Sequence, residues 1–209
     1  MKFKTLNALI AGLVLSVSSV ANAGILLSED FDPIDSANWS IINGEVLGTP
    51  SNEFYDGNAL YFEGSGIRAA STNSYDLSTG GILSFVLKIG GSDDTSTFED
   101  AEAGEDVAIQ YSLSNGDWTD LLVIDTEDTG YSGVWGEVSI NLTGLTSDTS
   151  FRWVQISHSG SVFDNWAIDN VQLINNIGPS SITVPEPTTI AILGLALIGL
   201  ASRRFKKQS

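Results

Sequence analysis

Alternation of apolar and polar residues dominates the middle of this chain. It is clearest over residues 83–89, 107–113 and 134–142. A period of two places the apolar side chains on one face of an extended segment, so each range predicts a β-strand with one buried face. Shorter strands are predicted at 25–28, 39–42, 59–63, 121–124, 151–158 and 166–173.

Turn-forming pairs separate these segments. They are Asn43-Gly44, Asp56-Gly57, Gly80-Gly81, Gly90-Gly91, Asn115-Gly116 and Ser132-Gly133. Such pairs tolerate positive φ, and no window between Gly24 and Pro187 shows a helical period. Roughly nine to eleven antiparallel strands at this spacing predict an all-β sandwich of the jelly-roll type, with a barrel as the alternative.

The N-terminus has the pattern of a secretory signal peptide. Lys2 and Lys4 precede an apolar run over 9–17, and Ala21-Asn22-Ala23 stands before Gly24. The small residues suit signal-peptidase cleavage, and the run is shorter than the ~20 residues that a membrane span needs. We therefore expect a signal peptide over 1–23 and export, and not the alternative of an N-terminal membrane anchor.

The C-terminus carries three successive features. Pro185-Glu186-Pro187 is followed by a short apolar segment over 190–201 and by a basic end that includes Arg203 and Arg204. This arrangement resembles a PEP-CTERM sorting tail. The resemblance implies recognition by an exosortase-type membrane protease and cleavage near Pro185 to Pro187. It also implies delivery to the cell surface or extracellular matrix of a Gram-negative bacterium.

The length of the tail agrees with such a role. About 12 apolar residues make a helix of roughly 18 Å, against a hydrocarbon core of ~30 Å, so the helix spans the bilayer only marginally. The basic residues behind it favour the cytoplasmic side. The tail thus predicts membrane contact before processing; the alternative is a permanent tail anchor. The expected organisation is a signal peptide (1–23), a sandwich domain (24–175), a linker (176–184) and the sorting tail (185–209).

Between the two ends the chain is strongly acidic. All 26 acidic residues lie between Gly24 and Pro187, with only Arg68, Lys88 and Arg152 as basic partners. Binding to nucleic acid or to anionic lipid needs Lys and Arg, so this balance excludes those partners for the domain and favours cations. The chain has no cysteine, so disulfides do not stabilise it. The acid-rich segment 92–106 is either a solvated loop or a loop ordered by calcium.

Three stretches resemble the reelin-repeat jelly roll. They are Leu27 to Asp32, Gly104 to Ser112 with Gly116 to Trp118, and Phe151 to Gln155 with Asp164 to Val171. The resemblance implies that the first and last strands lie close together and that a structural calcium ion sits where an early acidic turn meets a late Asp-Asn-Val. In this sequence the implied ligands are Glu29, Asp30, Asp32 and Asp169. Clustered carboxylates supply the hard oxygen ligands that Ca²⁺ prefers. The alternative is that these acids cap turns and face water.

Catalytic constellations are lacking in the sequence. His158 is the single histidine, which with the absence of cysteine excludes thiol catalysis and zinc sites with two imidazole or sulfur ligands. Residues 64–69 match the letters of a dinucleotide fingerprint, but no helix is predicted after them, so we interpret them as a hairpin turn. No catalytic residue is assigned.

Phe151, Trp153 and Trp166 could in principle stack on sugars. Large aromatics at strand positions pack more often in the core, and we favour that interpretation. The sequence therefore predicts a non-catalytic, calcium-stabilised surface or matrix protein of biofilm or envelope. The alternatives are a carbohydrate-binding module for an extracellular polysaccharide and, less favoured, a polysaccharide-cleaving enzyme. The ligand itself is not identified.

Overall fold

The computed structural model describes residues 23–48, 54–91, 97–114 and 116–176. These residues form eleven strands and one short 3₁₀ turn. The elements are β1 (Ala23–Glu29), η1 (Ser36–Asn38), β2 (Trp39–Ile42), β3 (Gly44–Gly48), β4 (Asn58–Phe62), β5 (Arg68–Thr72), β6 (Gly81–Ile89), β7 (Val107–Leu113), β8 (Trp118–Ile124), β9 (Gly136–Leu142), β10 (Thr149–Gln155) and β11 (Trp166–Asn176). The predicted signal peptide apart from Ala23, and the predicted linker and sorting tail apart from Asn176, lie outside the described residues. Within the described part of the chain, no helix is long and apolar enough to cross a membrane.

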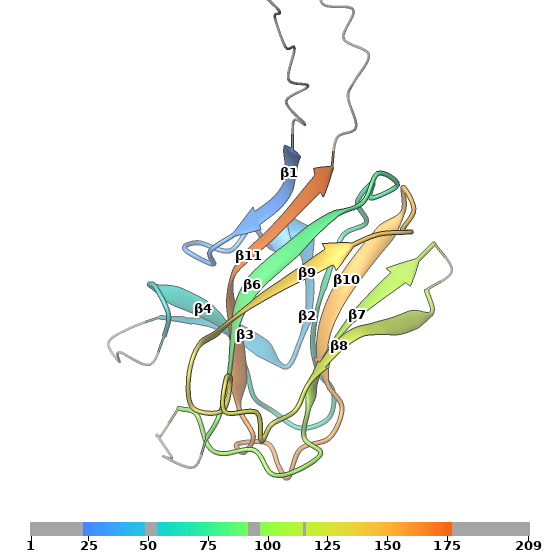
Figure 1. Cartoon of the computed structure of the whole chain (residues 1–209). Coiled ribbons are helices and arrows are strands. Elements are labelled where there is room, and N and C mark those ends of the chain that lie inside the picture. The colour runs from blue at the N-terminus through green and yellow to red at the C-terminus, as the bar shows by residue number, and fades with distance from the viewer. Residues whose placement is uncertain (1–22, 49–53, 92–96, 115, 177–209) are drawn as a thin grey trace, which may run out of the picture. The chain divides into compact units, whose positions relative to one another are not determined.

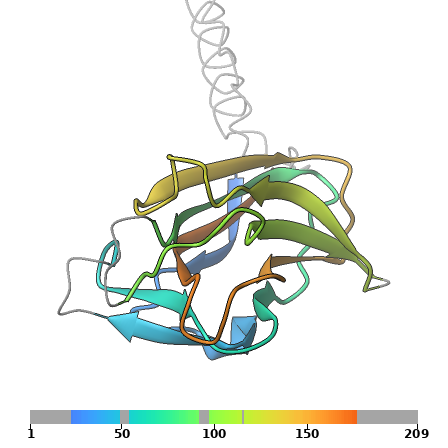
Figure 2. The same ribbon diagram turned by 90° about the horizontal axis from the view of Figure 1, so that it is seen from below.

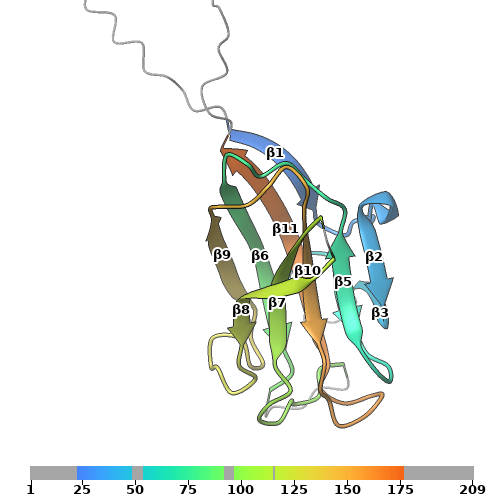
Figure 3. The same ribbon diagram turned by 90° about the vertical axis from the view of Figure 1, so that its right-hand side faces the viewer.

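The strands form two antiparallel sheets (Figure 1). The larger sheet has six strands in the order β3-β4-β11-β6-β9, with β1 also paired to β11, and the smaller has five in the order β2-β5-β10-β7-β8. Figure 3 places β5, β7 and β10 in front of β6, β9 and β11, and Figure 2 shows from below how the strands surround a common core. The predicted antiparallel β-sandwich is confirmed.

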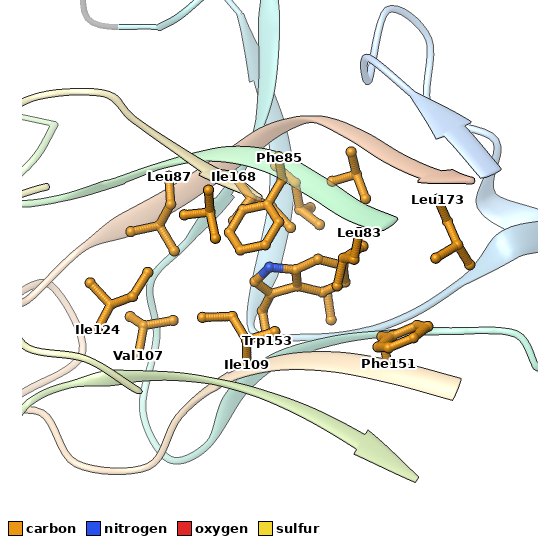
Figure 4. Packing of buried hydrophobic residues seen from close by; sticks show 14 of the residues in the cluster. Leu83, Phe85, Leu87, Val107, Ile109, Ile124, Phe151, Trp153, Ile168 and Leu173 are labelled. Atoms are coloured by element: carbon orange, nitrogen blue, oxygen red, sulfur yellow. The ribbon is translucent and has the colours of Figure 1, made fainter. Parts of the chain in front are cut away.

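Trp153 lies at the centre of the core between the sheets (Figure 4). Its ring packs edge-on against Phe85 of the opposite sheet, with centroids 5.2 Å apart, and tilted against Trp39 at 5.7 Å. The alternation that predicted β6 and β7 turns their apolar positions into this core, where Leu83, Leu87, Val107 and Ile109 are fully buried. Burial of such apolar surface is the main term that stabilises the sandwich.

The three aromatics considered for sugar stacking belong to this core. Phe151, Trp153 and Trp166 are each 0% exposed. Trp166 stacks on Phe62 with ring centroids 3.9 Å apart. The core interpretation is confirmed, and none of the three can form an exposed platform.

Two strands of the structure were not predicted from the sequence pattern. Segment β3 begins and ends with glycine, and β5 consists of small residues between Arg68 and Thr72, so neither shows apolar alternation. Pairing with β4, and with β2 and β10, makes them strands, because sheet propensity depends on neighbours. The hairpin predicted over 64–69 is wrong. Since β4 and β5 belong to different sheets, residues 63–67 form a connection between sheets, and Arg68 and Ala69 begin β5.

Candidate cation sites

Strand β11 changes its partner at Asp169. Up to Ile168 it pairs with β4, and from Val171 onward it pairs with β1, with Glu29 opposite Val171. On its other edge the register with β6 shifts between Asp169 and Gln172, and Asn170 adopts a positive φ of 49°. Because β1 and β4 leave Asp169 between them, its carboxylate meets the turn that follows β1 and the segment that precedes β4.

Glu29 organises the turn after β1. Its Oε1 accepts the Phe31 N–H (2.9 Å), and its Oε2 accepts the Asp35 N–H (3.0 Å) and the Trp39 Nε1–H (3.2 Å). Phe31 has a φ of 57° and buries its ring against Trp39, with centroids 5.6 Å apart. This buried Glu29 carboxylate therefore acts as a cap within the turn.

Asp30 and Asp32 are exposed on the same turn. Oδ1 of Asp30 accepts the Asp32 N–H (3.1 Å), and Oδ1 of Asp32 accepts the Asn58 N–H at the start of β4 (3.1 Å). A Cβ at Gly57 would come within 1.9 Å of Asp32 Oδ2, and Gly57 has a φ of 86°. Glycine at this position thus lets the Asp32 carboxylate lie directly against the backbone before β4.

Asp169 is fully buried in this arrangement. Its Oδ1 accepts the Asn170 N–H (2.6 Å), while Oδ2 has no hydrogen-bond partner. Burial raises the pKa of Asp169 to about 7; the Asn170 and Asp56 amides oppose the rise, and the charges of Asp32 and Asp30 add to it. A buried carboxylate that lacks a partner is costly, so this atom is a natural ligand for a cation.

The structure places Asp30 and Asp32 close enough to Asp169 for their charges to raise its pKa. Asp30 and Asp32 act on Asp169, whereas Glu29 faces the N–H groups of its own turn. A hollow of about 340 Å³ opens beside the turn and is lined in part by Glu29, Asp30 and Asn170. These residues suit a hard cation by their chemistry, although no three of the four bring their oxygens within 4.8 Å of one another.

A second set of carboxylates does form such a group and could hold a metal ion. Glu102, Glu105 and Asp164 each bring one oxygen within 4.8 Å of the other two. Glu102 is exposed, Glu105 is 8% exposed and Asp164 is 0% exposed. The segment before β7 and the loop between β10 and β11 supply them, at the end of the sandwich opposite Ala23 and Asn176 (Figures 1 and 3).

Ser159 links the members of this second set. Its Oγ–H lies 2.8 Å from Glu105 Oε1 and 3.2 Å from Glu102 Oε2, and its N–H donates to Asp164 Oδ2. The Glu102 N–H donates to Glu105 Oε2 (2.7 Å), and the Asp164 N–H donates to Glu99 Oε2 (2.8 Å). The carboxylates are thus held by the loops themselves.

The backbone of Asp164 is anchored by two buried polar side chains. Arg68 Nη1 donates to the Asp164 carbonyl oxygen (2.8 Å) and to Gln155 Oε1 (2.9 Å). Gln155 Nε2 donates to the carbonyl oxygens of Asp164 (3.1 Å) and Glu105 (3.0 Å). Arg68 is 0% exposed and donates hydrogen bonds to the carbonyl-type oxygens of Gly64, Gln155, Gly160 and Asp164. It fixes the loop without neutralising the Asp164 carboxylate through a direct hydrogen bond.

The pKa values of the two buried acids of this set shift in opposite directions. Burial raises the pKa of Asp164 to about 7, with further increases from Glu105 and Glu99, although the Ser159 N–H opposes them. Burial alone would also raise the pKa of Glu105, but hydrogen bonds from Ser159, Asp164 and Glu102 lower it. Without a cation, burial therefore favours the protonated form of Asp164 below about pH 7, beside a Glu105 carboxylate that is held ionised by its hydrogen bonds.

The sequence indicated only two of the three residues of this second set. It identified the acidic segment 92–106 as a candidate calcium-ordered loop, and Glu102 and Glu105 belong to that segment. Asp164 lay within a stretch used for the family resemblance but showed no sign of a ligand role. Its contribution depends on a contact between two connections far apart in sequence, which no local pattern encodes.

An aromatic groove lies on the outer face of the larger sheet. A hollow of about 390 Å³ is lined by side chains that include Tyr55, Ser84, Glu137 and Ser139. Tyr55 is 43% exposed and contacts the Trp135 ring, with centroids 5.8 Å apart. This combination of an exposed ring with hydroxyl and carboxylate groups is absent from the sequence predictions, because it depends on how the segment before β4 folds over β6 and β9.

His158 has no catalytic partner among its described contacts. Its Nδ1 lies 2.9 Å from the Gly160 carbonyl oxygen, and its Nε2 lies 2.6 Å from that of Gly66. Both ring nitrogens thus bridge two loop backbones.

Comparisons with known proteins agree with this architecture. The model of the Reelin subrepeat B family matches residues 44–174, and that of the PEP-CTERM protein-sorting motif matches residues 183–207. The sorting motif indicates an exported protein.

The solved structures that match this chain include an adhesin domain and carbohydrate-binding modules. One is the K3 cleaved adhesin domain of Lys-gingipain from Porphyromonas gingivalis w83, with 16% identity over 73% of this chain and 99% of that chain, at a TM-score of 0.52. Another is the C-terminal family 22 carbohydrate-binding module of Clostridium thermocellum Xyn10B, with 12% identity over 75% of this chain and 97% of that chain, at a TM-score of 0.49. The likeness to the adhesin domain shows a shared fold. With its β-sandwich matched over residues 44–174, the chain belongs to the Reelin subrepeat B family and carries a PEP-CTERM protein-sorting motif behind that domain.

Proposed function

We propose that this chain is a non-catalytic binding or structural module of the cell surface or extracellular matrix of a Gram-negative bacterium. An exosortase-type membrane protease recognises its tail through Pro185, Glu186 and Pro187, with Arg203 and Arg204 held on the cytoplasmic side. The observation that carries the proposal is a sorting motif directly after a complete sandwich, whose first and last strands pair from Ala23 with Asn176.

The sorting step is tested by the mass of the chain at the cell surface. Glu186→Ala should leave the chain membrane-bound and unprocessed, because it alters the motif that the protease reads. Glu127→Gln, on the exposed connection between β8 and β9, is the matched control and should be processed as the natural chain is. Mass spectrometry of surface and membrane fractions measures both. Equal processing of all three chains would contradict the proposal.

The absence of catalysis is supported by the chemistry of the described residues. His158 bridges backbone carbonyls, and the buried acids Asp164 and Asp169 accept hydrogen bonds from the backbone amides of Ser159 and Asn170. Purified protein should release no sugar or acid from extracellular polysaccharides or esters. Measured turnover that survives repurification would overturn this part of the proposal.

Calcium binding at the first site is the structural part of the proposal. Asp30, Asp32 and Asp169 would ligate the ion, with Glu29 shaping the turn and adding an oxygen if its cap loosens. The support is the buried Asp169 Oδ2 without a hydrogen-bond partner beside two further carboxylates. The ion would stabilise the junction of β1, β4 and β11, where the pairing of β11 changes.

A carbohydrate-binding module is the second candidate function. The groove beside Tyr55 favours it, because an exposed ring flanked by Ser84, Ser139 and Glu137 can stack on a sugar while polar groups bind its hydroxyls. Affinity electrophoresis in gels that contain extracellular polysaccharide tests it. Retardation that Tyr55→Ala abolishes would support the module, with Tyr131→Ala as an aromatic control outside the groove. Equal mobility in every polysaccharide would reject it.

A further inference from the structure

We propose that Glu102, Glu105 and Asp164 form a second calcium site, separate from the one at Asp169, that ties the segment before β7 to the loop between β10 and β11. The proposal goes beyond the proposed function, since neither sorting nor the first site requires it.

The geometry is that of a multidentate oxygen site. One oxygen from each of the three carboxylates lies within 4.8 Å of the other two. An ion coordinated at 2.3–2.6 Å requires ligands at about this mutual spacing. Ca²⁺ takes six to eight oxygens, so three carboxylates, water and the Ser159 hydroxyl can complete its shell.

Asp164 supplies an observation independent of the cluster. Its side chain is 0% exposed, and its Oδ1 has no hydrogen-bond partner. A buried polar atom normally has a partner, and an orphaned one points to a ligand or ion. Because Asp164 belongs to the group of converging oxygens, this buried and unpartnered oxygen lies on a carboxylate of the proposed site.

The charges around the site leave room for a divalent ion. Glu99 and Glu102 join Glu105 and Asp164 at this end of the sandwich, and the charges of Asp164 and Glu105 act on the buried guanidinium of Arg68. Arg68 gives its hydrogen bonds to carbonyl-type oxygens of Gly64, Gln155, Gly160 and Asp164. The carboxylates therefore keep a net negative charge that an ion would neutralise.

Access and selectivity follow from the burial pattern. Glu102 is exposed, while Glu105 and Asp164 are buried, so an ion can enter from solvent on the Glu102 side and be held within. The ligands sit on loops and not on a rigid octahedral frame. Such a site suits Ca²⁺, with its flexible coordination, better than Mg²⁺, which demands near-ideal octahedral geometry.

The test is calorimetric titration of calcium chloride into the full chain, purified in mild detergent and freed of metal with EDTA. Titration to ~10 mM covers the 10⁻⁴–10⁻³ M dissociation constants typical of extracellular modules. Asp164→Asn should abolish one binding event, and the exposed Glu102→Gln should weaken the same event about tenfold by removing one ligand charge. Glu127→Gln removes an exposed carboxylate from a neighbouring connection and should change nothing. Magnesium chloride should compete poorly.

The proposals of the two calcium sites can be refuted independently of each other. Asp169→Asn should remove only the event assigned to the first site. If Asp169→Asn abolishes all binding, or if Glu102→Gln and Asp164→Asn leave every event unchanged, the second site is refuted. Loss of the Glu102-dependent event alone, with Asp169→Asn silent, would support the second site and reject the first. Should Asp164→Asn fail to fold, Glu102→Gln decides the question alone.

Hydrogen exchange locates the bound ion by a measurement that does not depend on the heat of binding. Calcium should slow amide exchange in residues 97–106 and 156–165, because it joins these segments. The protection should be lost in Glu102→Gln and retained in Asp169→Asn. Protection confined to residues 29–35 and 54–58 would contradict the second site.

Discussion

The carboxylate oxygens of Asp164 and Glu105 meet within 4.8 Å of each other, although the two residues belong to different connections between the sheets. Both side chains are buried, and Ser159 hydrogen-bonds to each. Asp169 is the corresponding buried acid at the break in β11 pairing. These two places, where the sandwich buries negative charge, give rise to most of the predictions below.

Metal-free protein should lose stability as the pH rises from 5 to 7. In the folded state Asp164 and Asp169 keep their protons up to about pH 7, while the usual value is 3.8. Because these pKa values are raised on folding, the folded state binds more protons in this window. The stabilisation that these two groups contribute is therefore fully present below about pH 4, falls as the pH rises, and levels off above about 7. Each group contributes on the order of 2 kcal/mol between pH 5 and 7.

Urea unfolding of the full chain in EDTA at four pH values measures this slope. Asp169→Asn should make it shallower, because the neutral amide cannot titrate. The groups that face Asp169 are Asp30 and Asp32, and their repulsion acts in the same direction. A stability that is flat or rises with pH in the natural chain would contradict the burial of these charges.

Calcium should raise the melting temperature of the natural chain. Ligand at a hundred times its dissociation constant stabilises by ~2.7 kcal/mol, which for a domain of this size is a rise of roughly 5–10 °C. Asp169→Asn should remove the share of the rise that comes from the first site, whereas Glu127→Gln should retain the full rise. Scanning calorimetry in EDTA and in calcium checks both. An unchanged rise in Asp169→Asn would remove Asp169 from the ligands.

Trp153→Ala should be among the most damaging single substitutions. The ring is 0% exposed and lies between Phe85 and Trp39, so truncation leaves a cavity and costs about 3–5 kcal/mol. Trp118→Ala is the matched control. Trp118 is half-buried, with Arg152 4.4 Å over its ring, and its loss should cost about 1 kcal/mol. Urea midpoints of the two variants compare them, and similar losses would contradict the assigned core.

Arg68→Lys should destabilise the domain although it preserves the charge. The guanidinium of Arg68 donates hydrogen bonds in several directions to Gly64, Gln155, Gly160 and Asp164, and an ammonium cannot reproduce that planar fork. The buried acceptors left without donors should cost about 2–4 kcal/mol. Arg152→Lys, at a half-buried position, should cost less than 1 kcal/mol. Equal effects in urea unfolding would show that the fork is unimportant.

Much of the fold follows from local sequence. Leu83, Phe85 and Leu87 alternate with polar neighbours, and the structure turns all three into the core. The predicted strand over 39–42 and that over 107–113 have the observed bounds. Strands β3 and β5 were missed because glycine and small residues carry no alternation, and pairing with neighbours makes them strands. The connection over 64–69 was mistaken for a hairpin because sheet membership is not a local property.

By itself, the sequence determined the all-β class, the family and the sorting motif, since periodicity, turn chemistry and short motifs are properties of consecutive residues. It also pointed to Asp169 and the acidic turn as a pair through family resemblance. Only the tertiary structure decided that Glu29 caps its turn and that Asp169 lies where β11 exchanges β4 for β1. It alone joined Asp164 to Glu105 and Glu102. Burial and close approach of like charges arise when distant connections pack together, and the free energy that shifts their pKa values exists only in that packed state.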